Sequence, residues 1–309
     1  MSAPSGLIIV DKPAGWTSHD VVARLRRLAG TRRVGHAGTL DPMATGVLVV
    51  GVEKATRLLG HLALTDKEYE ATIRLGQATD TGDAEGSVTS GAPAAGVALT
   101  AVRAAAARLT GEVQQVPPAV SAIKVGGRRS YQLARAGKPP ELPPRTVTVA
   151  AFEVLTARCE NDLLDVEVTV TCSSGTYVRA LARDLGEALG VGGHLTRLRR
   201  RRVGHYDLSQ ARTLDQLAEA AASDLVMPMS VAAAAAFPSW HLTQDQARSL
   251  AFGSKLPGAG LPGGPVAALS PDGGLVALVE ERAGVVRPVA VFAEPPPAEL
   301  SAAEPSPPC

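Results

Sequence analysis

Hydrophobic residues in the first 225 positions repeat with two different periods, which predict the order of strands and helices. Continuous or alternating apolar residues are typical of strands, whereas apolar residues three or four positions apart are typical of helices. The pattern predicts strands at residues 7–10, 46–52, 67–76, 145–155, 163–175 and 195–206, and helices at residues 17–30, 54–64 and 176–190. Because this order contains no regular βαβ repeat, we predict an α+β fold with a largely antiparallel mixed sheet flanked by helices.

Two of these elements carry local detail that a structure can test. The helix at 17–30 follows Thr17 and Ser18, either of which can cap it, and Gly30 ends it. In the strand at 67–76, alternation places Tyr69 and the next three odd-numbered residues on one face.

The pattern changes after residue 225 and divides the chain into four parts. Residues 1–225 form the first domain, and residues 226–239 include an alanine run that predicts a helical connector. Residues 240–293 contain one helix and three short strands, which predict a small β-rich domain. Residues 294–309 combine Pro, Ala and Glu with few apolar residues, a composition typical of a disordered tail.

Composition argues against several kinds of protein. The three cysteines, Cys159, Cys172 and Cys309, are an odd number without metal-type spacing, so we expect neither a disulfide framework nor a zinc site. A reducing cytoplasm fits this usage. The first residues lack a basic region and contain only four consecutive large apolar residues, so we expect no signal peptide and no membrane span.

Positive charge is concentrated in the first domain. Residues 1–225 hold 27 Lys and Arg against 23 Asp and Glu, whereas residues 226–309 hold 4 against 7. The arginines gather in three segments at residues 24–33, 124–129 and 197–202. One such segment is usually a solvated face, but three in one domain favour a nucleic-acid partner. Aromatic residues are only 3% of the chain, which disfavours a stacking platform for single strands.

The segment "RVGHAGTLDPMATGVLVVGV" at residues 33–52 holds the main candidate for chemistry. We find no phosphate-binding glycine motif, and the six histidines are scattered, so we expect neither a nucleotide cofactor nor a metal. What remains is the carboxylate of Asp41 in a glycine-lined loop. From spacing alone, an Asx-turn before Pro42 is the more frequent explanation and catalysis the less frequent one.

The residues "GHAGTLDPMATGVL" resemble the catalytic motif of the bacterial tRNA pseudouridine synthase B family, which acts on the T-loop uridine at tRNA position 55. Four further segments match this family in the family's order, so the resemblance covers about residues 6–225. They are "IIVDKPAGWTSHDVV", "KEYEATIRLGQATDTGDAEG", "VPPAVSAIKVGGRRSYQLARAG" and "CSSGTYVRALARDLGEALG" with "HLTRLRRRRVG". The β-rich end resembles a PUA-type RNA-binding domain in the spacing of its strands and in "GGLVALVEE".

The resemblance implies an isomerase that converts uridine to pseudouridine in tRNA without ATP, metal or redox cofactor. It implies that Asp41 is the essential carboxylate, which either adds to ribose C1′ or removes a C2′ proton; the sequence leaves both routes open. Arg179 matches the family's partner arginine, which keeps the carboxylate ionised in a closed site. From the residues alone, a surface helix arginine is the more frequent explanation for Arg179.

The same resemblance assigns residues to the flipped base. His36 enters the RNA loop and holds the uridine out of its stack. Tyr69 stacks on the uracil, and its hydroxyl is a candidate for the last proton transfer. Tyr177 and Leu198 wall the uracil pocket. Without the family, His36 reads as a solvated loop residue and the other three as sheet or core residues.

Other matches concern architecture and RNA contact. Lys12, Pro13 and Gly38 are expected to shape the backbone around the site. Asp80 is expected to bind RNA or to orient Arg179, although a polar turn residue is an equal alternative. Phosphate contacts are expected from the basic segments, in particular from Lys124, Arg128, Arg129, Arg199 and Arg200.

Two other functions stay open beside the leading one. An RNA-folding factor would use base flipping and release without needing chemistry at Asp41. A guide-RNA-dependent synthase would need partner proteins and a larger RNA-binding extension, for which the sequence shows no segment. We expect a monomer that acts on the T-stem-loop of tRNA without an obligate protein partner and without a membrane.

Overall fold

The computed structural model describes residues 4–121, 123–130, 133 and 140–295. The chain divides into two compact units. The first comprises Ile8–Leu225 with the N-terminal residues up to Pro4, and the second comprises the chain from Val226 onward with Ser5–Leu7. The predicted disordered tail lies almost wholly outside the described residues, since the description ends at residue 295.

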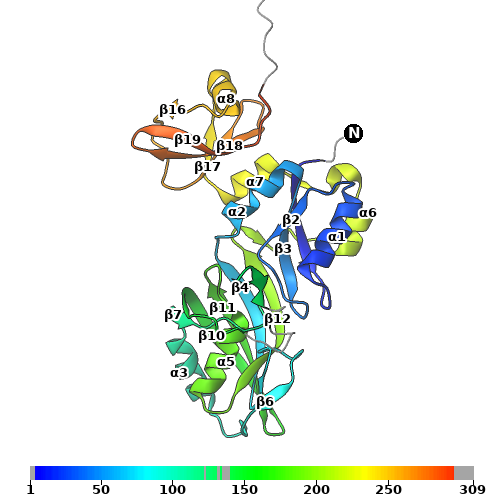
Figure 1. Ribbon diagram of the computed structural model, residues 1–309, viewed down its shortest axis with the longest axis vertical. Coiled ribbons are helices and arrows are strands. Elements are labelled where there is room, and N and C mark those ends of the chain that lie inside the picture. Colours follow the sequence, from blue (N-terminus) through cyan, green and yellow to red (C-terminus); the bar gives the residue numbers. More distant parts are fainter. Residues whose placement is uncertain (1–3, 122, 131–132, 134–139, 296–309) are drawn as a thin grey trace, which may run out of the picture. The chain divides into compact units, whose positions relative to one another are not determined.

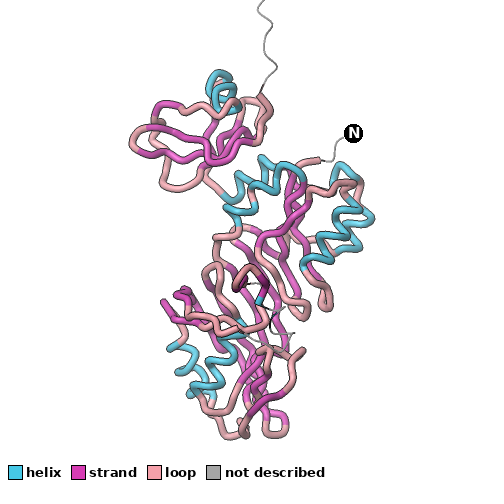
Figure 2. The backbone as a smooth tube through the Cα atoms, in the orientation of Figure 1, coloured by secondary structure: helices cyan, strands magenta, loops and turns pink. Residues whose placement is uncertain are grey.

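A long mixed sheet forms the first unit (Figures 1 and 2). Its described strands follow the order β1-β3-β12-β4-β11-β10-β7. Their bounds are β1 Gly6–Lys12, β3 Thr45–Val52, β12 Gly193–Val203, β4 Lys67–Leu75, β11 Leu163–Cys172, β10 Arg145–Glu160 and β7 Gly111–Gln115. The pairs from β12 to β7 are antiparallel, whereas β12 and β3 run parallel. This sheet with its flanking helices confirms the predicted α+β class.

Short strands extend the sheet or form hairpins beside it. Strand β2 (Val34–Ala37) pairs with β3, and β13 (Tyr206–Asp207) pairs with β12. Within the second unit, β14 (Met227–Pro228) pairs with Gly6 and Leu7. The separate hairpins are β5 (Ala78–Thr79) with β6 (Val88–Ser90), and β8 (Lys124–Val125) with β9 (Arg128–Arg129). The helical elements of this unit are α1 Ser18–Leu28, η1 Glu53–Arg57, α2 Leu59–Leu62, α3 Leu99–Arg108, α5 Val178–Ala188, α6 Leu214–Glu219 and η2 Ala222–Asp224.

Helix α1 forms where its capping residues and apolar spacing predict it. Thr17 is the N-cap, and its side chain and that of Asp20 bond reciprocally to each other's backbone N–H in a capping box. Val21, Val22 and Leu25 are buried, which matches one helical face. The side chain of Ser18, the first residue of the helix, bonds to the backbone of Leu40. The helix therefore begins beside the loop that carries Asp41.

The predicted helix at 54–64 is instead two short elements, the 3₁₀ helix η1 and the single turn α2. Ala55, Leu58, Leu59 and Leu62 are all buried. Because side chains repeat every three residues in a 3₁₀ helix, this spacing suits the broken arrangement as well as a continuous helix. The apolar pattern could not separate the two.

One core fills the space between the sheet and helices α3 and α5, which lie side by side against it (Figure 1). The buried face of α5 consists of Val178, Leu181, Ala182 and Leu185. Tyr69 and the alternate residues after it in β4 belong to the same core, as the alternation predicts. The sheet thus holds the start of α5 close to β4 and β12.

The second unit has its own sheet and core. Helix α7 (Met229–Ala236) covers the alanine run. The sheet order is β15-β17-β18-β19-β16, with helix α8 packed on it. The bounds are β15 Ser239–His241, α8 Gln244–Ala251, β16 Leu256–Pro257, β17 Val266–Leu269, β18 Leu275–Arg282 and β19 Val285–Val291. Within the described part of the chain, no helix is both long and apolar enough to cross a membrane.

Candidate active site

The segment that carries Asp41, residues 38–47, runs from the end of β2 into the first residues of β3, and we call it the Asp41 loop. Arg200 of β12 holds both of its ends. The Arg200 Nη2 donates to the Gly38 carbonyl at 2.9 Å, and Nε donates to the Val47 carbonyl at 2.7 Å. A Cβ added at Gly46 would lie 2.2 Å from the Arg200 carbonyl oxygen, so only glycine permits this approach of β3 to β12. The loop is therefore fixed from the sheet side.

The N-terminal turn fixes the same loop from the other side. The buried Lys12 Nζ donates to the carbonyls of Trp16 at 2.7 Å and Pro42 at 3.2 Å. The Gly15 N–H donates to the Pro42 carbonyl at 2.9 Å, and the Leu40 N–H donates to Ser18 Oγ at 2.9 Å. Burial lowers the pKa of Lys12 to about 8. Lys12 and its turn, which includes Pro13, thus contact the backbone that follows Asp41.

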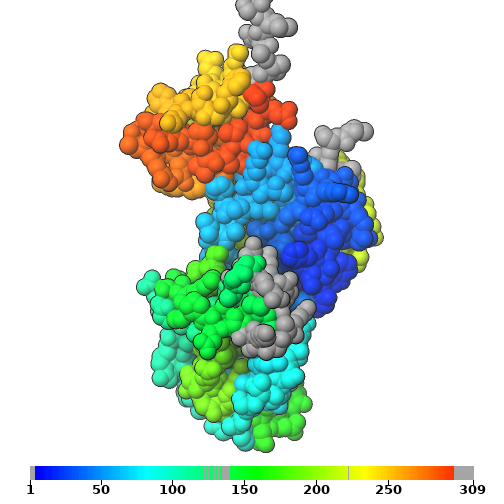
Figure 3. Space-filling view, in the orientation of Figure 1, coloured from blue at the N-terminus to red at the C-terminus, as the bar shows by residue number. Residues whose placement is uncertain are grey.

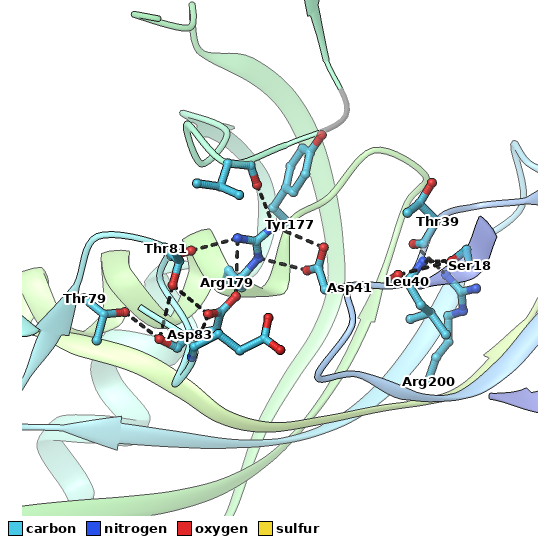
Figure 4. Close-up of polar contacts among 12 residues, drawn as sticks. Ser18, Thr39, Leu40, Asp41, Thr79, Thr81, Asp83, Tyr177, Arg179 and Arg200 are labelled. Atoms are coloured by element: carbon cyan, nitrogen blue, oxygen red, sulfur yellow. Dashed lines mark hydrogen bonds and ion pairs between the residues drawn. The ribbon is translucent and has the colours of Figure 1, made fainter. Parts of the chain in front are cut away.

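Arg179 makes a two-point contact with the Asp41 carboxylate, one contact to each oxygen (Figure 4). Its Nε lies 2.9 Å from Asp41 Oδ2, and its Nη2 donates to Oδ1 at 3.2 Å. The Arg179 side chain is only 4% exposed, whereas that of Asp41 is 33% exposed. A buried guanidinium is costly without compensating charge, so the Asp41 carboxylate compensates Arg179 at the edge of a solvent-accessible space.

A second carboxylate, Asp83, compensates the other side of Arg179. The Arg179 Nη1 lies 3.4 Å from Asp83 Oδ2 and donates to the Thr81 carbonyl at 2.8 Å. Asp83 is itself anchored, because its Oδ1 accepts from Thr81 Oγ1 at 2.6 Å and from the Glu85 N–H at 3.1 Å. Figure 4 shows Asp83 and Asp41 on opposite sides of the guanidinium.

Of the alternatives for Asp80, the contacts of its side chain match the polar turn residue. Asp80 is exposed, and its Oδ1 accepts from the Ser87 N–H at 2.9 Å, which makes it a turn residue. Both carboxylates stand in the stretch "ATDTGD", and nothing in their spacing separates them. Burial separates them, since Asp83 is buried against Arg179.

A cavity of about 240 Å³ opens beside the Asp41–Arg179 pair. The residues that line it come from five segments that are distant in sequence: Gly38, Thr39, Leu40, Asp41, Lys67, Tyr69, Ser121, Ser174, Gly175, Thr176, Tyr177, Val178, Arg179, Leu198 and Arg200. Burial raises the pKa of the Tyr69 and Tyr177 hydroxyls, so both are neutral at pH 7. The structure thus brings together Asp41, Tyr69, Tyr177, Arg179 and Leu198 around one cavity.

Gln115 at the end of β7 sets the position of Tyr177. Its Oε1 accepts from the Tyr177 N–H at 2.8 Å, and its Nε2 donates to the Tyr177 carbonyl at 3.1 Å. These bonds hold the residue directly before α5, from which Arg179 extends. Sequence reasoning missed Gln115, because a glutamine in a polar strand gives no signal of such a role.

His36 does not line the cavity. It lies on β2, and its ring meets the ring of His19 edge-on, with centroids 5.6 Å apart and planes at 85°. His36 therefore stands near the Asp41 loop but outside the cavity wall.

The arginines of residues 197–202 are not the open basic surface that their sequence suggests. Apart from the buried Arg200, each contacts a carboxylate of β1, β4 or β11, or of the residue before β4. The pairs are Arg197–Glu167 at 3.1 Å, Arg199–Asp11 at 2.8 Å, Arg201–Glu70 at 2.5 Å, and Arg202–Asp66 at 2.8 Å. We therefore find this segment largely neutralised within the sheet.

Arg200, which we expected to contact RNA phosphates, is instead buried. It is 1% exposed, and its guanidinium donates to backbone carbonyls of the Asp41 loop. The alternation of β12 turns it toward the cavity rather than toward solvent. For Lys124, Arg128 and Arg129, the structure describes the backbone of the β8–β9 hairpin only, so their side chains lie outside the described residues.

No group of three or more His, Cys, Asp or Glu side chains is placed to hold a metal ion among the described residues.

Comparisons with known families match most of the chain, from residue 26 to residue 293. Residues 26–178 match the TruB family pseudouridylate synthase N-terminal domain. Residues 179–232 match the tRNA pseudouridylate synthase B C-terminal domain, and residues 237–293 match the C-terminal domain of tRNA pseudouridine synthase II.

Similar proteins give the same result. The tRNA pseudouridine synthase B of Arthrobacter sp. (strain FB24) is 59% identical over 299 residues, covering 94% of this chain and 97% of that protein. That of Thermobifida fusca (strain YX) is 60% identical over 292 residues, covering 93% and 98%. The crystal structure of a Cbf5–Nop10–Gar1 complex contains a similar chain, with a TM-score of 0.72 and 29% identity over 94% of this chain and 85% of that one.

The fold and these matches define the chain as a pseudouridine synthase. Within this class, the extent and identity of the matches show that it belongs to the TruB family. The family and enzyme class predicted from the five sequence segments are therefore confirmed.

Proposed function

We propose that this protein isomerises uridine 55 in the T-loop of tRNA to pseudouridine, with Asp41 as the essential carboxylate. The observation that carries the proposal is the two-point contact of Arg179 with Asp41 at the mouth of the cavity. The N1–C1′ bond of uridine breaks, the uracil turns, and a C5–C1′ bond forms. The C5 proton leaves and N1 gains one, so product and substrate have the same atoms.

The Asp41–Arg179 geometry suits either route for the first step. A carboxylate fixed by a guanidinium stays ionised where water is displaced by a bound nucleotide. Asp41 Oδ atoms then either attack C1′ or remove the C2′ proton, and both routes require the same anion at the same place. Arg179 is buried and Asp41 is partly open, so the carboxylate is the member of the pair that meets the ribose.

The cavity has room to admit one pyrimidine base, since its volume is about 240 Å³. Tyr69 lies in its wall, where an aromatic face stabilises a flipped base by about 1–3 kcal/mol. Burial raises the pKa of the Tyr69 hydroxyl, so Tyr69 carries its proton in the resting site. Its place in the wall makes this hydroxyl the candidate for the transfer in which C5 loses a proton and N1 gains one.

The other residues that line the cavity keep the cleaved uracil in place while it turns. Leu198 and Tyr177 close the cavity, which keeps a cleaved uracil from escaping into solvent. His36 lies outside this wall, on the strand that leads into the Asp41 loop, and we assign it to the RNA loop from which the uridine leaves.

The names of the relatives support tRNA as the substrate. We propose that the chain acts in the cytoplasm as a monomer, without an obligate protein partner. The similar chain in the Cbf5–Nop10–Gar1 complex works in an assembly, so activity of the purified chain on tRNA alone separates the two arrangements.

The test is a position-resolved map of pseudouridine in an unmodified tRNA transcript after incubation with the purified protein. We expect conversion at position 55 by the wild type, none by Asp41→Asn, and none in a transcript with cytidine at that position. Asp80→Asn is the matched control, because it removes an exposed carboxylate that does not contact Arg179. If the wild type modified the T-loop no better than Asp41→Asn, the proposal would fail.

A further inference from the structure

We propose that Lys67 and Arg200 form a cationic wall of the cavity that stabilises the uracil as an anion after it leaves ribose C1′. The inference rests on the proposed function, because it assigns further residues to the same reaction. When the N1–C1′ bond breaks, its electron pair stays on N1, and the negative charge spreads to the O2 and O4 carbonyls. Both routes open to Asp41 give this anion. The charge persists until C5 attacks C1′, after which the C5 proton leaves and N1 gains one.

The two cations lie beside the residue that we assign to stacking on the uracil. Lys67 and Tyr69 are alternate residues of β4 and share its buried face. Arg200 is the partner of Tyr69 on β12. A Cβ added at Gly38 would lie 3.4 Å from both Arg200 Nη1 and Lys67 Cε, so the two side chains approach the same point of the Asp41 loop. An anionic base in the cavity therefore meets both cations.

Neither cation is neutralised by a carboxylate. In the part of the chain that the structure describes, the bonds of the buried Lys67 and Arg200 go to backbone carbonyls and to Tyr69, and no ion pair involves them. The Lys67 Nζ donates to the carbonyls of Ala63 at 3.1 Å and Thr65 at 2.8 Å. An ammonium has three N–H groups, so one remains for a ligand in the cavity.

Two neighbouring buried cations repel each other, which is costly for the empty site. Burial, and after it the charge of Arg200, lower the pKa of Lys67 to about 8. Cys172 and Asp66 act on Lys67 in the opposite direction. Asp66 contacts Arg202 at 2.8 Å, so its charge is already engaged. An anion between the two cations relieves their repulsion, and such perturbed groups in a cavity are typical of a functional site.

The other cation of the cavity is already balanced. Arg179 contacts Asp41 on one side and Asp83 on the other. In their ionised forms these three groups carry one negative charge together, whereas Lys67 and Arg200 carry two positive charges. Figure 4 shows Arg179 and Arg200 on opposite sides of Asp41. The cavity is therefore negative where the carboxylate meets the ribose and positive toward the sheet, where a departing base gains charge.

The test compares two leaving groups. Fluorine at C5 withdraws electrons, so 5-fluorouracil carries the charge of the broken bond more easily than uracil and depends less on the cations. Two unmodified tRNA transcripts are used, one with uridine and one in which 5-fluorouridine replaces uridine throughout. Because no proton leaves C5 in the fluorinated RNA, the single-turnover reaction is followed as loss of the N1-linked nucleoside, by chromatography of nuclease digests.

Two variants remove the charge of Lys67. Lys67→Met also removes the N–H donors, whereas Lys67→Gln keeps donors for the Ala63 and Thr65 carbonyls. Since Arg200 remains, we expect both variants to convert uridine about 10- to 100-fold more slowly than the wild type, and 5-fluorouridine no more than about threefold more slowly. The anion exists only after bond cleavage, so tRNA affinity should stay within about threefold of the wild type.

Lys255→Met is the matched control. Lys255 is exposed and belongs to the second unit, whose segments run from yellow to red in Figure 3, and we expect wild-type rates on both substrates. Thermal unfolding checks the fold, and Lys67→Gln alone carries the comparison if Lys67→Met is unstable. Four results overturn the cationic wall: wild-type rates in the variants, a wild-type rate in Lys67→Gln only, equal slowing on both substrates, or a loss of affinity as large as the loss of rate.

The wild-type reactions separate this inference from the proposed function. Conversion at position 55 together with any of the four results overturns the cationic wall and leaves the proposed function intact. Conversion at another uridine, with the expected difference between the two substrates there, overturns the proposed position and leaves the cationic wall intact. Absence of any conversion overturns both.

Discussion

Replacement of Arg200 by methionine tests whether the backbone of the Asp41 loop is set by one buried cation. Methionine keeps an unbranched apolar stem in the core and removes the guanidinium. The change therefore deletes the bonds to the Gly38 and Val47 carbonyls without opening a large cavity.

The expected effects on stability and on turnover differ in size. Each charge-assisted bond contributes about 1.5–3 kcal/mol, so the two bonds together contribute roughly 3–6 kcal/mol. Removal of a buried charge also relieves a desolvation penalty of several kcal/mol. The two terms nearly cancel, and we expect the free energy of unfolding to change by no more than about 2 kcal/mol. The loop, in contrast, loses its contacts with the sheet and keeps only those with the N-terminal turn. A shift of about 1 Å at Asp41 lowers turnover about 100-fold.

The assay combines urea unfolding with single-turnover conversion of a tRNA transcript at saturating protein. Arg201→Met is the matched control, because Arg201 is the next residue of β12 and contacts Glu70 at the surface. We expect near wild-type conversion by Arg201→Met and about 100-fold slower conversion by Arg200→Met. Conversion within threefold of the wild type by a folded Arg200→Met protein would refute the reasoning.

Three further predictions concern neighbouring groups. Arg179→Lys leaves Asp41 one donor where it now has two contacts. We expect the single-turnover rate to fall by roughly 10²- to 10⁴-fold with little change in RNA affinity. A fall in RNA affinity as large as the fall in rate would contradict this. Asp83→Asn removes the charge opposite Arg179, so we expect a decrease in both unfolding free energy and turnover, and an unchanged turnover would show that Asp83 does not position the arginine. Burial lowers the pKa of Lys67 to about 8 from 10.5, so between these pH values the unfolded chain holds a proton that the folded protein lacks. The free energy of unfolding should therefore rise with pH in this window, by at most about 3 kcal/mol for this group, and Lys67→Met should flatten that rise in urea unfolding at pH 8 and pH 10.

Sequence patterns were most informative where one residue's environment is decided by its own neighbours along the chain. The cap and apolar face of α1 are both local features, and the structure has them where they were predicted. The alternation of β4 likewise placed Tyr69 on the buried face. Local patterns were less informative for η1 and α2, because the same apolar spacing suits two kinds of helix.

Properties that depend on a distant partner were not accessible from the sequence. The arginines of β12 looked like an RNA-binding segment because their carboxylate partners stand on β4, β11 and β1, far away along the chain. Asp80 and Asp83 stand in the same polar stretch of the sequence. The position of Arg179 between Asp83 and Asp41 separates their roles. Gln115 gained a role only through the backbone of Tyr177. In each case a partner that is distant in the sequence, not the residue type, decides what the side chain does.

Release of tritium from tRNA labelled at uracil C5 tests the central claim most directly, because formation of the C5–C1′ bond expels the C5 hydrogen. We predict that the wild type releases one equivalent from position 55, and that Asp41→Asn binds the same tRNA with affinity within about tenfold of the wild type but releases none. Release by a folded Asp41→Asn protein at a rate near that of the wild type would contradict the account, since the carboxylate held by Arg179 would then not be the group that performs the reaction.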